Sequence, residues 1–132
     1  MTKEEQVGFD PKKSQVSKKK LADFIRLQLG GNLTEVPGVG DEAVKRLATG
    51  EGVERVTNTY QLIGMFLALR GPDKGDDHQV DTKEHCEKFW NWLKSKGINS
   101  NRSGIVTAIA EKVNIWIPGI YDEEACAVVN VD

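Results

Sequence analysis

The chain has 132 residues, with 18 Lys and Arg against 20 Asp and Glu, so its formal net charge is −2 at pH 7. This length is enough for one domain with a buried core, and the charge balance excludes a protein that is basic over its whole surface. There is no apolar run near the roughly eighteen residues of a transmembrane helix, no secretory signal and only two cysteines, so we expect a reduced intracellular protein, nuclear or cytoplasmic if eukaryotic, without membrane insertion.

The charge is unevenly distributed along the chain. Residues 1–70 contain eleven Lys and Arg and nine Asp and Glu, whereas residues 71–132 contain seven and eleven. A nucleic-acid interface would therefore be local and built mainly from the first half.

Residues 1–16 predict a flexible N-terminal arm, because they contain few apolar side chains. Lysines form two basic clusters, at Lys12–Lys13 and Lys18–Lys20. The clusters suit a phosphate-seeking arm or a nuclear address, and a solvated tail is an equal alternative.

The first expected helix follows Ser17, a favourable N-cap, and runs to about Leu29, before Gly30-Gly31. Its apolar side chains recur at helical spacing, and they are Leu21, Phe24, Ile25 and Leu29.

The stretch Leu33–Leu47 has the pattern of a helix-hairpin-helix motif. Pro37 and Gly38 end a short helix, and Gly40 precedes a second helix that runs from Asp41 to about Ala48. We expect Val36 and Val39 to anchor the turn in the core, while the amides of Val39, Gly40 and Asp41 point outward, where a phosphate can bind. The alternative is a corner without a ligand, which the acidic Asp41 and Glu42 favour, because they complement the helix dipole and repel phosphate.

A further helix is expected over Tyr60–Leu69, with Asn58 or Thr59 as its cap. Its apolar residues cover so much of its circumference that we expect it to be the central helix, with Gly64 allowing a neighbouring helix to approach closely. An acidic loop follows at 71–82. A calcium-binding loop is a weak alternative there, because the acidic positions do not fit the required twelve-residue frame.

The next expected helix is capped at Asp81 and runs to Lys96, with Gly97 as its stop. Trp90 and Trp92 are expected not to face one core together, which suggests an apolar surface for a homodimer. The alternative is that one ring lies flat on the surface of the monomer. The expected inward positions are Cys86, Phe89, Trp90 and Leu93.

The last helix is expected to begin at a cap within Asn99–Asn101 and to end at Pro118-Gly119. A stripe at helical spacing would face the core, namely Ile105, Ile109, Val113 and Trp116, with Val106 and Ile117 beside it. Residues 119–132 form an acidic and then apolar tail that either docks or stays loose.

No catalytic or metal-binding constellation is apparent. His78 and His85 are expected to be solvent-facing or structural, Cys86 to lie in the core, and the Cys and His spacings do not fit a metal site. We therefore expect neither an enzyme nor a cofactor.

Several segments match one known arrangement in the same order. These segments are Lys20–Ile25, Gly38–Gly40 with Lys45-Arg46-Leu47, Leu62–Leu69, and Phe89-x-x-Trp92-Leu93-Lys94 followed by Gly97-x-Asn99. Through them the chain resembles the barrier-to-autointegration factor family over roughly residues 17–117. The acidic loop, the N-terminal arm and the C-terminal tail are additions to that pattern. Gly104 stands where the family has a basic residue, and Arg102 is the nearest candidate to replace it.

The resemblance implies an all-α fold of the SAM-like type, a compact bundle of five to six short helices with a helix-hairpin-helix motif over residues 17–118. It also implies a homodimer that binds and bridges double-stranded DNA without sequence preference. The alternative is an oligomeric protein-interaction scaffold of the same fold that binds no nucleic acid. The expected DNA-binding residues are Lys20, Gly38, Val39, Gly40, Asp41, Lys45, Arg46 and Arg102.

Overall fold

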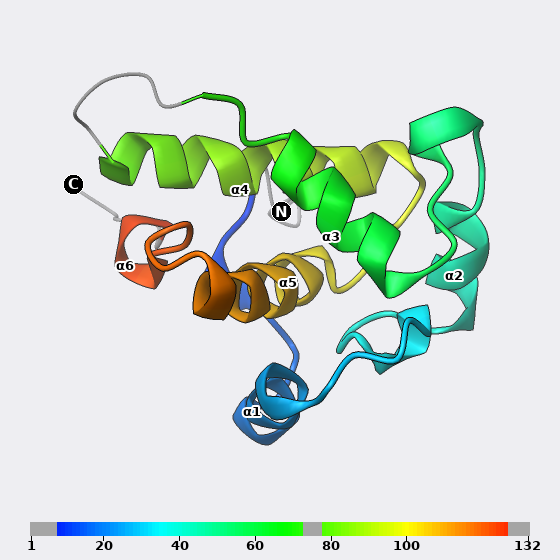
Figure 1. The fold of residues 1–132 in the computed structure, drawn as a ribbon, viewed down its shortest axis with the longest axis horizontal. Helices are drawn as coiled ribbons and strands as arrows, with labels where there is room; N and C mark the ends of the chain where they lie inside the picture. Colours follow the sequence, from blue (N-terminus) through cyan, green and yellow to red (C-terminus); the bar gives the residue numbers. More distant parts are fainter. Residues whose placement is uncertain (1–7, 73–77, 127–132) are drawn as a thin grey trace, which may run out of the picture.

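The computed structural model describes residues 8–72 and 78–126 (Figure 1). All regular elements in these ranges are helical, which confirms the expected all-α class. The α-helices are α1 (Lys18–Arg26), α2 (Asp41–Leu47), α3 (Thr59–Ala68), α4 (His78–Ser95), α5 (Arg102–Trp116) and α6 (Glu123–Cys126), and the 3₁₀ turns are η1 (Pro11–Lys13), η2 (Leu33–Glu35) and η3 (Gly52–Glu54).

Helix α5 is the centre of the fold. All of its residues from Ser103 to Ala110 are buried, and it packs against α1, α3, α4 and η1. In Figure 1 it lies in the middle of the molecule, between α4 and α1. Small side chains on α5, such as Gly104, Ala108 and Ala110, let neighbouring elements approach it closely.

The prediction that the helix over Tyr60–Leu69 is central is wrong. Helix α3 buries Leu62 and Phe66 completely, but Tyr60, Gly64 and Leu67 face outward. A Cβ added at Gly64 would meet nothing within 4 Å, so this glycine does not admit a neighbouring helix within the described chain. Tyr60 and Leu67 of α3 therefore remain exposed at the surface.

Helix α1 begins as expected and ends earlier than expected. The Ser17 side chain accepts a hydrogen bond from the Lys20 amide at 3.1 Å, which caps the helix. The helix stops at Arg26 instead of Leu29, because the buried ammonium of Lys112 binds the carbonyls of Phe24, Ile25 and Leu27. The ammonium supplies a charged donor to carbonyls at the end of the helix, where intrahelical donors run out, and the Phe24 carbonyl also accepts from the Leu27 amide.

Helix α4 begins at His78, earlier than the expected cap at Asp81, which lies in its first turn. The expected loop at 71–82 is shortened accordingly, and residues 73–77 lie outside the described part. At the other end, Gly97 has φ of +85° and stops the helix as predicted.

Both tryptophans of α4 are buried, which contradicts the expectation that they cannot share one core. Trp90 is fully buried, and Trp92 is 9 % exposed. The Trp92 indole donates a hydrogen bond to Glu54 of η3 at 3.1 Å and stacks parallel to Phe89. Because η3 covers this side of α4, the second ring needs no partner from outside the chain.

His85, which was expected to be either solvent-facing or structural, has a structural position. It is 1 % exposed, its Nε2 lies 2.6 Å from the carbonyl oxygen of Phe66, and its ring stacks on the Phe66 ring. Burial lowers the pKa of His85, although the Phe66 carbonyl opposes that shift. Cys86 is buried beside it, as expected.

The prediction of a flexible arm over residues 1–16 is wrong for residues 8–16, and residues 1–7 lie outside the described part. Phe9 is 2 % exposed and meets Tyr121 edge to face. The Asp10 amide donates a hydrogen bond to the Ser103 hydroxyl of α5 at 3.2 Å. The segment therefore belongs to the folded domain.

The C-terminal part also docks, as far as it is described. Ile120 and Tyr121 are buried, and α6 packs against α4 and buries Cys126. In the preceding helix, Ile105, Ile109 and Val113 face the core as expected. Trp116 does not, since it is 54 % exposed at the end of α5.

Candidate nucleic-acid interface

The segment Val36–Gly40, which we call the 36–40 turn, connects η2 to α2. Val36 and Val39 are buried, as the sequence predicted, and they fix the turn in the core. The first expected helix of the motif is only the single 3₁₀ turn η2, because Pro37 holds Val36 in an extended conformation.

The two glycines of the turn have different surroundings. Gly38 has φ of +94°, and a Cβ there would lie 3.0 Å from Ile105 and 3.5 Å from Asn101. Gly40 has negative φ, and a Cβ there would meet nothing within 4 Å. Gly38 therefore lets the turn lie against α5, whereas Gly40 faces open space.

Glu35 holds η2 in place on the other side of the turn. Its carboxylate accepts hydrogen bonds from the amides of Gly30 and Gly31 and from the Thr59 hydroxyl, at 2.7 to 3.0 Å. Burial would raise the pKa of Glu35, but these hydrogen bonds and the nearby Lys112 charge lower it overall. The carboxylate thus joins η2 to the start of α3.

The amides of the turn only partly match the expectation. The Val39 amide donates to the Val36 carbonyl at 3.0 Å, so it does not point outward. Gly40 is the N-cap of α2 and has no side chain that could accept a hydrogen bond from the first turn. The binding groups that remain from the prediction are the amides of Gly40 and Asp41, and both residues are exposed.

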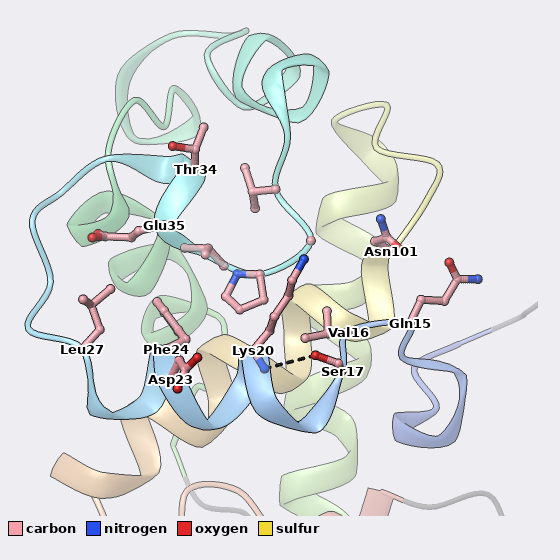
Figure 2. A pocket seen from close by; sticks show the side chains of 14 residues that line it. Gln15, Val16, Ser17, Lys20, Asp23, Phe24, Leu27, Thr34, Glu35 and Asn101 are labelled. Carbon is pink, nitrogen blue, oxygen red and sulfur yellow. Dashed lines mark hydrogen bonds between the residues drawn. The ribbon is translucent and has the colours of Figure 1, made fainter.

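Lys20 lies across a cavity of about 600 Å³ from the turn. Figure 2 shows its side chain rising from α1 toward the 36–40 turn. Pro37, Gly38 and Asn101 line the same cavity, so the structure brings together groups from three separate parts of the chain. Asp23 and Glu35 add carboxylates to the wall, and Asp23 is also bound by Lys19 and Arg26.

Of the two cationic residues on α2, Lys45 is exposed and Arg46 is paired. The Arg46 guanidinium binds Glu42 at 3.0 Å and lies beside Gly97, where a Cβ would be 3.1 Å from its Nη1. The Arg46–Glu42 ion pair is exposed and therefore contributes little to stability. The Arg46 guanidinium lies beside Gly97 at the end of α4.

Arg102 does not belong to the exposed surface around the turn. Its guanidinium lies over the Trp90 ring at 4.2 Å, and its Nη1 donates to the Ile98 carbonyl at 2.7 Å. Burial lowers the pKa of this guanidinium. Its position is that of a packing residue at the start of α5.

Asn101 contacts the turn and was not among the expected site residues. It has φ of +62° and is the N-cap of α5, although its side chain makes no capping hydrogen bond. The sequence signal that could have indicated it is weak, because Asn is common in the left-handed conformation at many turns.

No family model, curated protein or solved structure matched the chain. Within residues 8–72 and 78–126, no group of three or more His, Cys, Asp and Glu is arranged to hold a metal ion. None of the helices in these ranges combines the length and hydrophobicity that a bilayer crossing requires.

Proposed function

We propose that this protein binds double-stranded DNA without sequence preference, through the 36–40 turn. The observation that supports the proposal most is the pairing of an open Gly40 with a Gly38 that is packed against α5. Gly38 is held against α5, while the backbone at Gly40 is open to solvent. A phosphate at Gly40 would receive hydrogen bonds from the amides of Gly40 and Asp41.

The cationic residues around the turn support the same proposal. Lys20 approaches the turn from α1 across the cavity, and Lys45 is exposed on α2, the helix that follows the turn. Backbone amides and lysines contact the phosphodiester backbone and carry no base information. Binding of this kind would be independent of sequence and strongly dependent on salt.

We also propose that the protein forms a homodimer through an apolar face, which we define as Tyr60, Gly64 and Leu67 of α3 with Ile115–Ile117 at the end of α5. The large side chains of this face are at least one-third exposed. Gly64 leaves room for a second backbone on α3. A symmetric dimer through this face would carry two DNA sites, which is the arrangement that the resemblance to the barrier-to-autointegration factor family implies, and it would let one dimer bridge two duplexes.

The competing proposal is an oligomeric protein-interaction scaffold that binds no nucleic acid. Asp41 and Glu42 in the first turn of α2 favour it, because they place negative charge beside the phosphate position. The apolar face would serve a scaffold equally well.

A gel-shift assay with random duplex DNA at two salt concentrations tests the DNA proposal. We expect the parent protein to bind and to weaken steeply with salt, and the Gly40→Glu variant to lose most of its affinity while it remains folded. Asn91→Glu, on the exposed side of α4, adds the same charge elsewhere and should bind as the parent does. If the Gly40→Glu variant is folded and binds duplex DNA as well as the parent does, the 36–40 turn is a structural connection that does not contact DNA.

A further inference from the structure

The segment Asp10–Ser14 is an ordered turn that displays two lysines. The Asp10 carboxylate accepts a hydrogen bond from the Lys12 amide at 3.0 Å, and the Lys13 and Ser14 amides donate to the carbonyls of Asp10 and Pro11. Lys12 and Lys13 are both exposed. Their backbone is therefore held while their ammonium groups remain in solvent.

Contacts on both sides anchor this turn to the domain. Before it, Phe9 is buried against Tyr121. After it, Val16 covers Gly104 of α5, where an added Cβ would lie 2.7 Å from the Val16 side chain and 3.3 Å from the Ser14 hydroxyl. Gly104 is thus the glycine that allows the segment to lie on α5.

The segment and the 36–40 turn flank the same end of α5. Ser14 and Val16 lie over Gly104, and the 36–40 turn lies against Asn101 and Ile105. Directly after the segment, Gln15, Val16 and Ser17 (Figure 2) line the same cavity as Pro37, Gly38 and Val39 of the 36–40 turn. The first turn of α5 holds the two segments as one unit.

We propose that Lys12 and Lys13 form a second phosphate-contact site, so that a duplex bound at the 36–40 turn continues across the start of α5 onto η1. This inference rests on the proposed DNA binding and extends it to a surface that the sequence suggested only as a flexible arm. Residues 8–26 contain six Lys and Arg but only two Asp, so this segment is cationic although the whole chain is not.

The ordered backbone of Lys12 and Lys13 reduces the entropy that these residues lose when they bind a phosphate. A lysine on a disordered arm must lose backbone freedom when it binds, whereas these two lysines sit on a turn that folding has already ordered. Their contribution to affinity therefore depends on the docking of the segment as well as on their charge.

The first experiment removes the charges. The double variant Lys12→Ala/Lys13→Ala is compared with the parent in binding to random duplex DNA over a series of salt concentrations. We expect the slope of log affinity against log salt to fall by about two units, and affinity near 0.1 M salt to fall roughly tenfold or more. Lys83→Ala/Lys88→Ala, which removes two exposed lysines from α4, should leave the slope unchanged.

The second experiment keeps every charge and displaces the segment. Gly104→Leu inserts a side chain where Val16 lies, inside a helix that tolerates leucine well. We expect it to weaken binding severalfold, with little further loss when the two lysine substitutions are added. If the Leu variant lacks a cooperative melting transition, Gly104→Ala gives the same test with a smaller clash.

The outcomes separate this inference from the proposal on which it rests. If Gly40→Glu abolishes binding and the Lys12/Lys13 variant keeps the parental slope, the second site is excluded and the DNA proposal stands. If the lysine variant loses affinity but folded Gly104 variants bind as the parent does, the lysines act as a loose arm, and the ordered site is excluded. If the parent does not bind duplex DNA, both proposals fail.

Discussion

The ammonium of Lys112, on the central helix α5, donates a hydrogen bond of 2.7 Å to the carbonyl of Phe24 in α1. It also binds the carbonyls of Ile25 and Leu27, and it lies 5.2 Å from the centroid of the Phe24 ring. Lys112 is only 3 % exposed, so this charge is satisfied almost entirely by the end of α1. The contact sets where α1 ends and thereby orients the helix that carries Lys20.

Replacement of Lys112 by methionine should destabilise the protein by about 3 kcal/mol. The side chain keeps a similar length, but the carbonyls of Phe24, Ile25 and Leu27 lose a charged donor in a partly buried place. Urea unfolding followed by circular dichroism measures the change. Lys88→Met, at an exposed position of α4, should change stability by less than about 0.5 kcal/mol. Equal effects of the two substitutions would show that the contact adds nothing to stability.

The two glycines of the 36–40 turn should respond differently to alanine. Gly38→Ala is expected to cost about 1–3 kcal/mol, because φ there is +94° and the new Cβ would lie 3.0 Å from Ile105. Gly40→Ala should be nearly neutral, since φ is −104° and the site is open. Thermal unfolding of the two variants side by side tests this difference, and a Gly38 variant as stable as the Gly40 variant would contradict the turn geometry.

Stability should decline as the pH falls below the ordinary histidine range, because His85 is buried. Burial lowers its pKa in the folded protein, and the charges of Arg70 and Lys88 lower it further. The unfolded chain takes up a proton near pH 6.5, whereas the folded chain resists it, so the stability from neutral His85 is present above that pH and is lost as the pH falls through the folded pKa. Urea unfolding at about pH 7 and about pH 5.5 should show the decline. The same two measurements on His85→Gln should show a smaller decline in stability. A decline as large as that of the parent would mean that other groups cause it.

Asp41→Lys should strengthen DNA binding, because it removes a negative charge beside the proposed phosphate position and adds a positive one. The salt slope should rise by about one unit if the new lysine contacts a phosphate. Glu124→Lys makes the same charge change at an exposed position in the first turn of α6, and it serves as the control. Equal gains in both variants would indicate a nonspecific effect of net charge.

The double variant Leu67→Gln/Trp116→Gln should shift the proposed dimer toward monomer. Leu67 and Trp116 are 36 % and 54 % exposed on the apolar face, and burial of such side chains is the main driving force of association. Sedimentation velocity at tens of micromolar, an order-of-magnitude range for interfaces of ordinary size, measures the shift. Val53→Gln is the matched control, since Val53 is 84 % exposed on η3. A parent protein that is monomeric at that concentration would exclude this dimer.

Local features of the sequence were sufficient to predict where helices α1 to α5 form, but not α6 or every helix end. Ser17 and Asn58 cap α1 and α3 through hydrogen bonds to amides three residues away, and Gly97 stops α4 through its own φ. The burial of Val36 and Val39 beside two glycines was predictable for the same reason, because apolar spacing and the conformational freedom of glycine act over a few residues.

Only the tertiary structure decided the features that depend on residues far apart in the chain. The end of α1 depends on Lys112, and the burial of Trp92 depends on Glu54, which lies 38 residues away. The order of the N-terminal segment depends on the space above Gly104, and Arg102 is withdrawn from the surface by Trp90. Each of these contacts joins groups whose distance is set by how the helices pack against α5, and the periodicity of a single helix carries no information about which neighbour will cover it.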